Sequence, residues 1–97
     1  AVDIRKKSKT FGKKFEIVLS DKNNKSVYIP PGFAHGFMCL SKENIINYSC
    51  TNYRSVGYEY SLLYNDKKLK INWPFKKVII TKKDKTARTF NELLDKF

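Results

Sequence analysis

The sequence predicts a single all-β domain of the sandwich, jelly-roll or barrel type. Three observations lead to this prediction: short apolar or alternating segments recur along the chain, turn residues separate them, and helical spacing occurs only near the C-terminus. Many short strands divided by turn signals are typical of these β folds. The 97 residues fit one domain at most. No repeat or linker divides them, so residues 1–97 form one predicted domain.

The predicted strands are rich in β-branched and aromatic residues, as strands usually are. They span residues 15–19, 26–29, 37–40, 44–50, 58–64, 69–73 and 78–80. The polar run at residues 20–24 predicts the turn after the first strand. Pro30 and Pro31 end the second strand, and Gly32 permits a tight turn behind them.

The C-terminal segment is the exception to the β pattern. Apolar side chains recur there at positions 90, 93, 94 and 97, which is the spacing of one helix face. Thr89 stands where an N-cap residue is needed, and Glu92 follows three residues later to complete a capping box. The sequence therefore predicts a short helix that begins behind Thr89.

The net charge of the chain indicates which classes of partner it could bind. The chain carries 20 Lys and Arg against 9 Asp and Glu, a formal charge of +11, yet only Arg5, Arg54 and Arg88 are arginines. Nucleic-acid readers favour clustered arginines with stacking aromatics, so no nucleic-acid partner is expected. A small anionic substrate suits the charge. The longest uncharged stretch, residues 26–41, holds two prolines and a histidine, so no membrane-spanning helix is expected.

Cys39 and Cys50 are the only cysteines, too few for a disulfide-dense secreted scaffold. Their spacing fits no zinc motif and His35 is the only histidine, so no metal site is expected. Both cysteines lie in apolar segments, which are a poor setting for an activated thiolate. We expect two reduced core thiols in a cytoplasmic protein.

Three side chains have the chemistry of a functional site. His35 stands between the small residues Ala34 and Gly36, which leaves room for a ligand, although a structural histidine in a turn is the simpler interpretation. Tyr48 lies in the middle of a predicted strand, where a tyrosine usually packs in the core. Its phenol, with an ordinary pKa near ~10, could instead serve as a general acid. Asp84 is flanked by lysines, which is typical of a solvated turn.

A series of short motifs runs through the chain in a fixed order. They are Val-Asp-Ile-Arg-Lys at residues 2–6, Thr-Phe-Gly at 10–12, Ile-Pro-Pro-Gly-Phe-Ala-His-Gly-Phe at 29–37, Tyr48, Thr-Asn-Tyr at 51–53, Asn-Asp at 65–66, Ile-Asn-Trp-Pro at 71–74 and Lys-Asp at 83–84. In order and spacing this series resembles the dTDP-4-dehydrorhamnose 3,5-epimerase family over essentially all 97 residues. The run at 29–37 is its most specific part. The resemblance covers the C-terminal half of the family's usual chain.

The resemblance implies a cupin-type jelly roll, or double-stranded β-helix, with a short C-terminal helix. It also implies a homodimer that holds a nucleotide sugar inside the barrel and uses no metal or cofactor. The implied reaction removes a proton next to the C4 ketone of the sugar, at C5 and in some members at C3, and returns one to the opposite face. A His acts as the base with an Asp beside it, and a Tyr acts as the acid, because inversion needs groups on opposite faces.

The resemblance assigns roles to three residues of this chain, and a departure from the family pattern singles out a fourth. The acid falls on Tyr48, and the Asp partner of the base falls on Asp84. His35 falls in the substrate pocket, where it could also stabilise the enolate. Arg54 replaces an aromatic residue that many members carry, and is expected to bind substrate. The family's base lies in an Arg-Gly-Leu-His segment that does not occur here. We therefore expect the N-terminal part of the barrel to be missing, and the chain to be the C-terminal portion of a longer enzyme.

The leading functional prediction is a nucleotide-4-keto-sugar 3,5-epimerase of surface polysaccharide biosynthesis, such as lipopolysaccharide or capsule. Its substrate would be dTDP-4-dehydro-6-deoxyglucose, as in dTDP-rhamnose synthesis, or a GDP-4-keto-heptose. Two alternatives stay open. One is a cupin ketoisomerase, which moves the carbonyl of a similar sugar nucleotide. The other is a fragment that binds a sugar nucleotide without turning it over.

Overall fold

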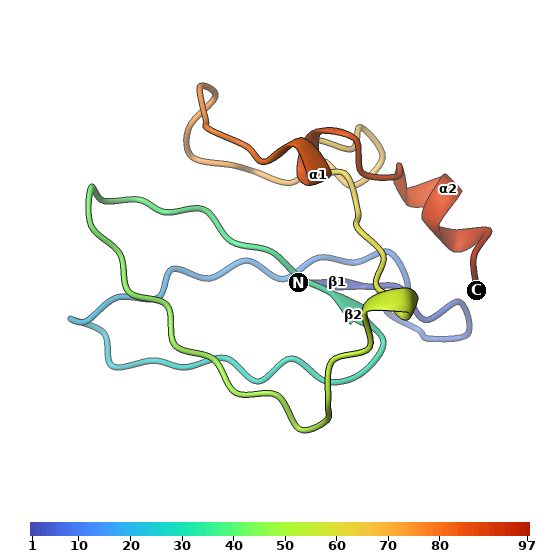
Figure 1. Cartoon of the computed structure of the whole chain (residues 1–97), viewed down its shortest axis with the longest axis horizontal. Coiled ribbons are helices and arrows are strands. Elements are labelled where there is room, and N and C mark those ends of the chain that lie inside the picture. Colours follow the sequence, from blue (N-terminus) through green and yellow to red (C-terminus); the bar gives the residue numbers. More distant parts are fainter.

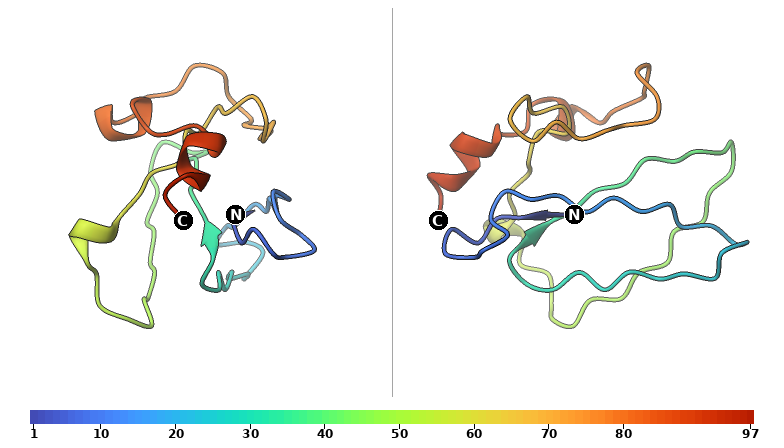
Figure 2. Two further views of the ribbon diagram at one scale, coloured as in Figure 1. Left: turned by 90° about the vertical axis from the view of Figure 1, so that its right-hand side faces the viewer. Right: turned by 180° about the vertical axis from the view of Figure 1, so that it is seen from behind.

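The structure is a computed structural model that describes the backbone of all 97 residues and every side chain except that of Val56. Its regular elements are short. They are β1 (Val2–Asp3), β2 (Phe33–Ala34), the 3-10 helix η1 (Val56–Tyr58), α1 (Lys82–Lys85) and α2 (Phe90–Leu94). Long connecting segments run outward from the two strands and turn back at the far side of the molecule (Figures 1 and 2).

The two strands form a short antiparallel pair near the centre of the molecule (Figure 1). Val2 lies opposite Ala34, and Asp3 lies opposite Phe33. A second segment follows the other edge of β1, because the Asp3 amide donates to the Lys13 carbonyl at 3.0 Å. The N-terminal residues therefore lie between a returning loop and the segment that contains the Phe-Ala-His-Gly-Phe motif.

The core joins the first residues of the chain to the last. Val2, Leu69 and Phe90 are buried and form one cluster. Partly buried side chains pack around them, namely Ile4, Phe11, Leu62, Ile71 and Leu94. The rings of Phe11 and Phe90 have their centroids 5.6 Å apart. This contact ties α2 to the loop that follows β1.

The C-terminal helix predicted from the sequence is confirmed as α2. The Thr89 hydroxyl accepts from the Glu92 amide at 3.3 Å, and the Glu92 carboxylate accepts from the Thr89 amide at 2.8 Å, which completes the capping box. The buried carboxylate of Asp66 adds a second cap, because it accepts from the Phe90 amide at 2.8 Å. Phe90 and Leu93 are the buried side chains of this helix.

The strand predictions are wrong, because none of those segments forms a regular strand in the structure. The backbone, described throughout, has strands only at β1 and β2 and isolated bridges at Val2–Lys14 and Leu62–Arg88. A strand needs a neighbour that exchanges backbone hydrogen bonds with it, and side-chain alternation cannot supply that neighbour. The apolar residues that drew the prediction, such as Phe15, Ile45 and Ile79, are consequently exposed.

The prediction of core cysteines is also wrong. Cys39 and Cys50 are both free and exposed. Each lies on one of the long segments that lack a paired neighbour, so no second layer of side chains covers it. None of the helices in the described part of the chain combines the length and the apolar character needed to span a bilayer.

Candidate active site

An ion pair across a 3-10 turn organises the candidate site. Arg54 donates through Nε and Nη2 to the two carboxylate oxygens of Glu59, with Nη2 at 2.9 Å from Oε2. The helix η1 lies between the two residues, and the Tyr58 amide donates to the Ser55 carbonyl at 3.0 Å. This tight turn brings Arg54 and Glu59 together. The two-point contact fixes the plane of the guanidinium, as forked Arg–carboxylate pairs do.

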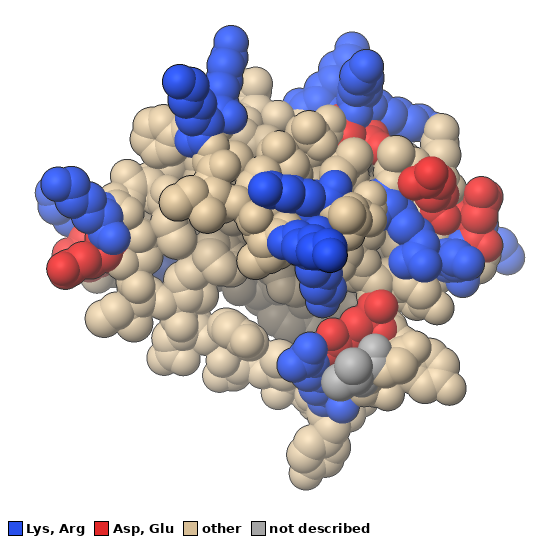
Figure 3. Space-filling view, turned by 45° about the horizontal axis from the view of Figure 1, so that its top comes forward, with Lys and Arg blue, Asp and Glu red and all other residues tan. Residues whose placement is uncertain are grey.

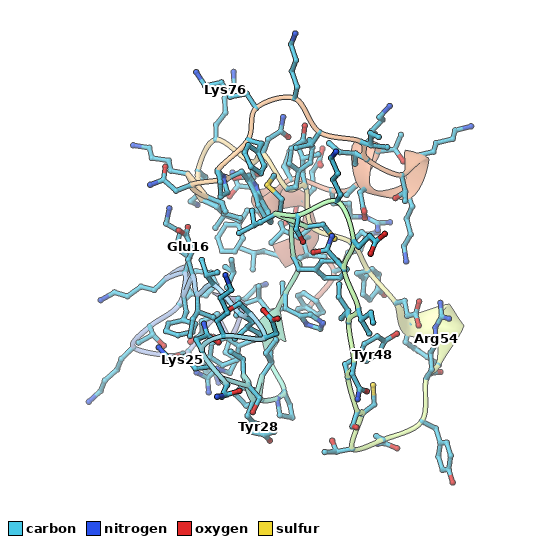
Figure 4. The ribbon with its side chains drawn as sticks, turned by 90° about the vertical axis from the view of Figure 1, so that its left-hand side faces the viewer. Glu16, Lys25, Tyr28, Tyr48, Arg54 and Lys76 are labelled. Atoms are coloured by element: carbon cyan, nitrogen blue, oxygen red, sulfur yellow. The ribbon has the colours of Figure 1, made fainter. Side chains whose placement is uncertain are left out.

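Tyr48 lies within the electrostatic reach of this pair. The pKa of Arg54 is raised, mainly by its hydrogen bonds to Glu59 and to a smaller extent by the charge of Tyr48. The Tyr48 side chain is 79% exposed. Figure 4 shows Tyr48 and Arg54 on the same side of the molecule, away from Glu16, Lys25 and Tyr28. The phenol of Tyr48 is therefore open to a ligand and stands in the field of a fixed cation.

The helix α1 approaches Glu59 from the other side. Lys83 places Nζ 3.9 Å from Oε2 of Glu59, and the pKa of Glu59 is lowered by Arg54 first and by Lys83 to a lesser extent. Thr81 caps α1 by accepting from the Asp84 amide at 3.2 Å. Asp84 is thus the neighbour of a residue that contacts Glu59, and it is exposed at the helix surface.

A surface pocket of about 380 Å³ lies beside α1. It is lined by Glu59, Ser61, Lys83, Thr86, Ala87 and Arg88. The guanidinium carbon of Arg88 lies 5.5 Å from the centroid of the Tyr60 ring. Two cationic residues and one carboxylate give this pocket a positive balance, which suits an anionic group of a ligand.

His35 lies apart from this cluster. It follows β2 directly, so the pairing of Ala34 with Val2 sets its backbone position. The ring is exposed. Among the described side chains, no hydrogen bond or ion pair joins His35 to Arg54, Glu59 or Lys83.

Comparison with known sequences decides the family. The sequence model described as dTDP-4-dehydrorhamnose 3,5-epimerase matches residues 1–92. The chain belongs to this family. The family has the cupin jelly-roll fold, and no solved structure matches the chain itself. Members of the dTDP-4-dehydrorhamnose 3,5-epimerase family from three organisms show how much of a relative the chain spans.

The relatives in question carry the name dTDP-4-dehydrorhamnose 3,5-epimerase. That of Salmonella typhimurium is 43% identical over 97% of this chain and 52% of its own length. That of Methanothermobacter thermautotrophicus is 41% identical over 95% of this chain and 51% of its own. That of Escherichia coli is 39% identical over 97% of this chain and 51% of its own. The chain thus spans about half the length of the curated relatives it matches.

For this epimerase-family chain, the structure places two of the four predicted site residues, Tyr48 and Arg54, on the same side of the molecule. Asp84 adjoins Lys83, whose Nζ lies 3.9 Å from Oε2 of Glu59, whereas His35 stays separate. Glu59 and Lys83 were not predicted from the sequence. A possible signal was the pair of opposite charges at positions 54 and 59 across the Gly57 turn. Among the described side chains, no group of three His, Cys, Asp or Glu could hold a metal ion.

Proposed function

We propose that this chain is the C-terminal portion of a nucleotide-4-keto-sugar 3,5-epimerase. The observation that carries the proposal is the match of the epimerase family over residues 1–92, which includes the Phe-Ala-His-Gly-Phe run. The substrate would be dTDP-4-dehydro-6-deoxyglucose or a GDP-4-keto-heptose. The reaction would take place in the cytoplasm and serve the synthesis of surface polysaccharide. The working enzyme would be a homodimer.

The reaction depends on the acidity of carbons next to a ketone. A base removes the proton at C5 or C3, and the electron pair moves to the C4 oxygen to form an enolate. An acid on the opposite face then protonates the carbon and inverts it. The base keeps the proton that it takes from the carbon, and the acid gives its own proton to the opposite face. Solvent then restores both groups, so the overall reaction is an isomerisation without oxidant or reductant.

Tyr48 would be the acid. Its phenol is exposed to a ligand, and donation of its proton leaves a phenolate. The guanidinium of Arg54 is held by Glu59 in the vicinity of that phenol.

Asp84 would orient and polarise the base, and His35 would contact the sugar or its enolate oxygen. Lys83 and Arg88 line the pocket beside Asp84 and would face the diphosphate of the nucleotide. The net charge of +11 would draw an anionic substrate to the protein.

Solvent deuterium incorporation tests the proposal. The chain is incubated in D2O with dTDP-4-dehydro-6-deoxyglucose, alone and fused behind the N-terminal half of the Salmonella typhimurium relative, which is expected to supply the base. NMR follows C3 and C5. We expect deuterium at C5, at C3 or at both in the fusion. Asp84→Asn should slow its entry about 10²- to 10⁴-fold, whereas the exposed Asp21→Asn should not.

The same experiment separates the competing functions. A ketoisomerase would give a product with its carbonyl moved, which the carbon spectrum identifies directly. A binding-only protein would shift the sugar resonances without exchange. The absence of an Arg-Gly-Leu-His segment from these 97 residues favours that alternative for the isolated chain. No exchange in a folded fusion, with dTDP and GDP sugars both tried, would overturn the epimerase proposal.

A further inference from the structure

A buried carboxylate holds Arg5 in one conformation. Asp3 is 1% exposed and accepts from Arg5 Nε at 2.9 Å and from Arg5 Nη2 at 2.8 Å. The hydroxyls of Ser8 and Thr10 donate to its second oxygen at 2.7 and 2.6 Å. The forked contact fixes the plane of the guanidinium. The side chain of Arg5 therefore has a defined direction although it is half-exposed.

In this direction the side chain of Arg5 passes over Gly32. A Cβ on Gly32 would lie 2.5 Å from Cγ and 2.6 Å from Cδ of Arg5, and Gly32 has φ of +88°. Beyond the glycine, the guanidinium carbon of Arg5 stands 4.8 Å from the centroid of the Phe33 ring, which is cation–π range. The Ile4 amide also donates to the Gly32 carbonyl at 3.0 Å. The stem of Arg5 thus occupies the space that only a glycine leaves free.

These contacts influence the position of His35, because His35 directly follows β2. Phe33 and Ala34 pair with Asp3 and Val2, and His35 is the next residue. The side chain of His35 is exposed. The position of His35 therefore depends on where the turn at Gly32 places β2 beside β1.

We propose that Arg5 is a positioning residue, which is held by Asp3, lies over Gly32 and Phe33, and fixes where His35 enters the substrate site. The proposal rests on the proposed function in one respect, namely that His35 belongs to that site. An ion pair that only stabilised the N-terminal loop would leave the His35 ring unchanged when Arg5 is replaced.

His35 is the only histidine of the chain, so its ring resonances can be followed by NMR without ambiguity. The variants are Arg5→Ala, Arg5→Lys and Gly32→Ala, with Lys9→Ala as a matched control at an exposed site of the same loop. We expect Arg5→Ala and Gly32→Ala to shift the His35 resonances. Arg5→Lys should stay closer to the wild type, because it keeps the aliphatic stem over Gly32.

The double variant Arg5→Ala with Gly32→Ala adds an internal check. The methyl added at position 32 then no longer meets the Arg5 stem, while the backbone strain at φ of +88° is the same in both cases. Its effect on His35 should therefore be smaller than when Arg5 is present. Thermal unfolding shows whether each variant is folded, and Gly32→Ala decides the question if Arg5→Ala does not fold.

The proposal is overturned if His35 in folded Arg5→Ala or Gly32→Ala matches the wild type, or changes no more than in Lys9→Ala. Because this readout needs no substrate, its failure is distinct from a failure of the deuterium experiment. If the Arg5 and Gly32 variants displace the His35 resonances but the protein exchanges no deuterium, the positioning role is supported and the epimerase proposal is rejected. If the His35 resonances stay unchanged in these variants and the protein does exchange deuterium, only the positioning role is rejected.

Discussion

Single residues carry much of the order in this molecule, and Asp3 is the clearest case. It accepts hydrogen bonds from Arg5, Ser8 and Thr10 while almost fully buried. The pKa of its carboxyl is held far below the ordinary range, mainly by Arg5, against an opposing effect of burial. The charge-assisted bonds from Arg5 depend on the ionised carboxylate, so protonation of this one side chain would weaken the contacts of the N-terminal loop.

The depressed pKa of Asp3 predicts how stability depends on acid. The pKa of the unfolded carboxyl is about 3.9, and the pKa of the folded carboxyl is lower, so its contribution to stability is fully present above that value. As the pH falls below it toward the folded pKa, the unfolded chain takes up the proton first and the contribution is lost. Asp3→Asn should therefore flatten the loss of stability below pH 4 in urea titrations. Asp21→Asn, in an exposed turn, is the control; an equal slope in wild type and Asp3→Asn would contradict the assignment.

The candidate site could be predicted only in part from single residues. Tyr48, Asp84 and His35 have suitable chemistry, but each also has an ordinary structural explanation, and only the family resemblance set them apart. Glu59 was missed because its partners, Arg54 and Lys83, meet only when the η1 turn and α1 have formed. Long-range ion pairs of this kind leave no periodic signal in a sequence.

At the scale of elements, the helix could be predicted and the strands could not. The signals of α2 are local, because Thr89 and Glu92 satisfy the end of the helix within three residues. The signals of a strand state only that a segment is extended and half-apolar. Whether residues 44–50 join a sheet depends on partners far along the chain. The helix α1 escaped prediction because its four residues contain no apolar face.

The capping box of α2 gives a direct test at this scale. Thr89→Ala removes the hydroxyl that accepts from the Glu92 amide, so the folded chain should lose about 1 kcal/mol of its free energy of unfolding. Thr81→Ala, at the exposed four-residue helix α1, should cost less. Chemical denaturation of the two variants compares them. A larger loss in Thr81→Ala would place the main stabilising helix end at α1 instead.

At the scale of the whole molecule, the folded state depends on a small core. Phe90 is 1% exposed and contacts both the N-terminal loop and the buried Leu69. Phe90→Ala should cost about 3–5 kcal/mol, which is most of the stability of a small domain. Phe97→Ala removes the same ring from an exposed site and should cost much less. Circular dichroism melts would contradict this account if the two variants melted alike.

The surface charge is the second property of the whole molecule. Lys and Arg are spread over the face shown in Figure 3, and carboxylates lie beside several of them. The net charge is +11. Affinity for dTDP should therefore fall about threefold to tenfold between 20 and 200 mM salt, because mobile ions screen the attraction. Calorimetric titration measures this, with uncharged thymidine as the control. A salt-independent affinity for dTDP would argue against electrostatic capture.

The central claim is that Tyr48 donates the proton that inverts the sugar carbon. Tyr48→Phe keeps the ring and removes the phenol, so a fusion that carries the family's base should still exchange C5 with D2O. Formation of the inverted product should fall about 10²- to 10⁴-fold. Tyr53→Phe, at another exposed tyrosine five residues along, is the matched control. Exchange without inversion in Tyr48→Phe is the result we predict; inversion at the wild-type rate in that variant would contradict the claim.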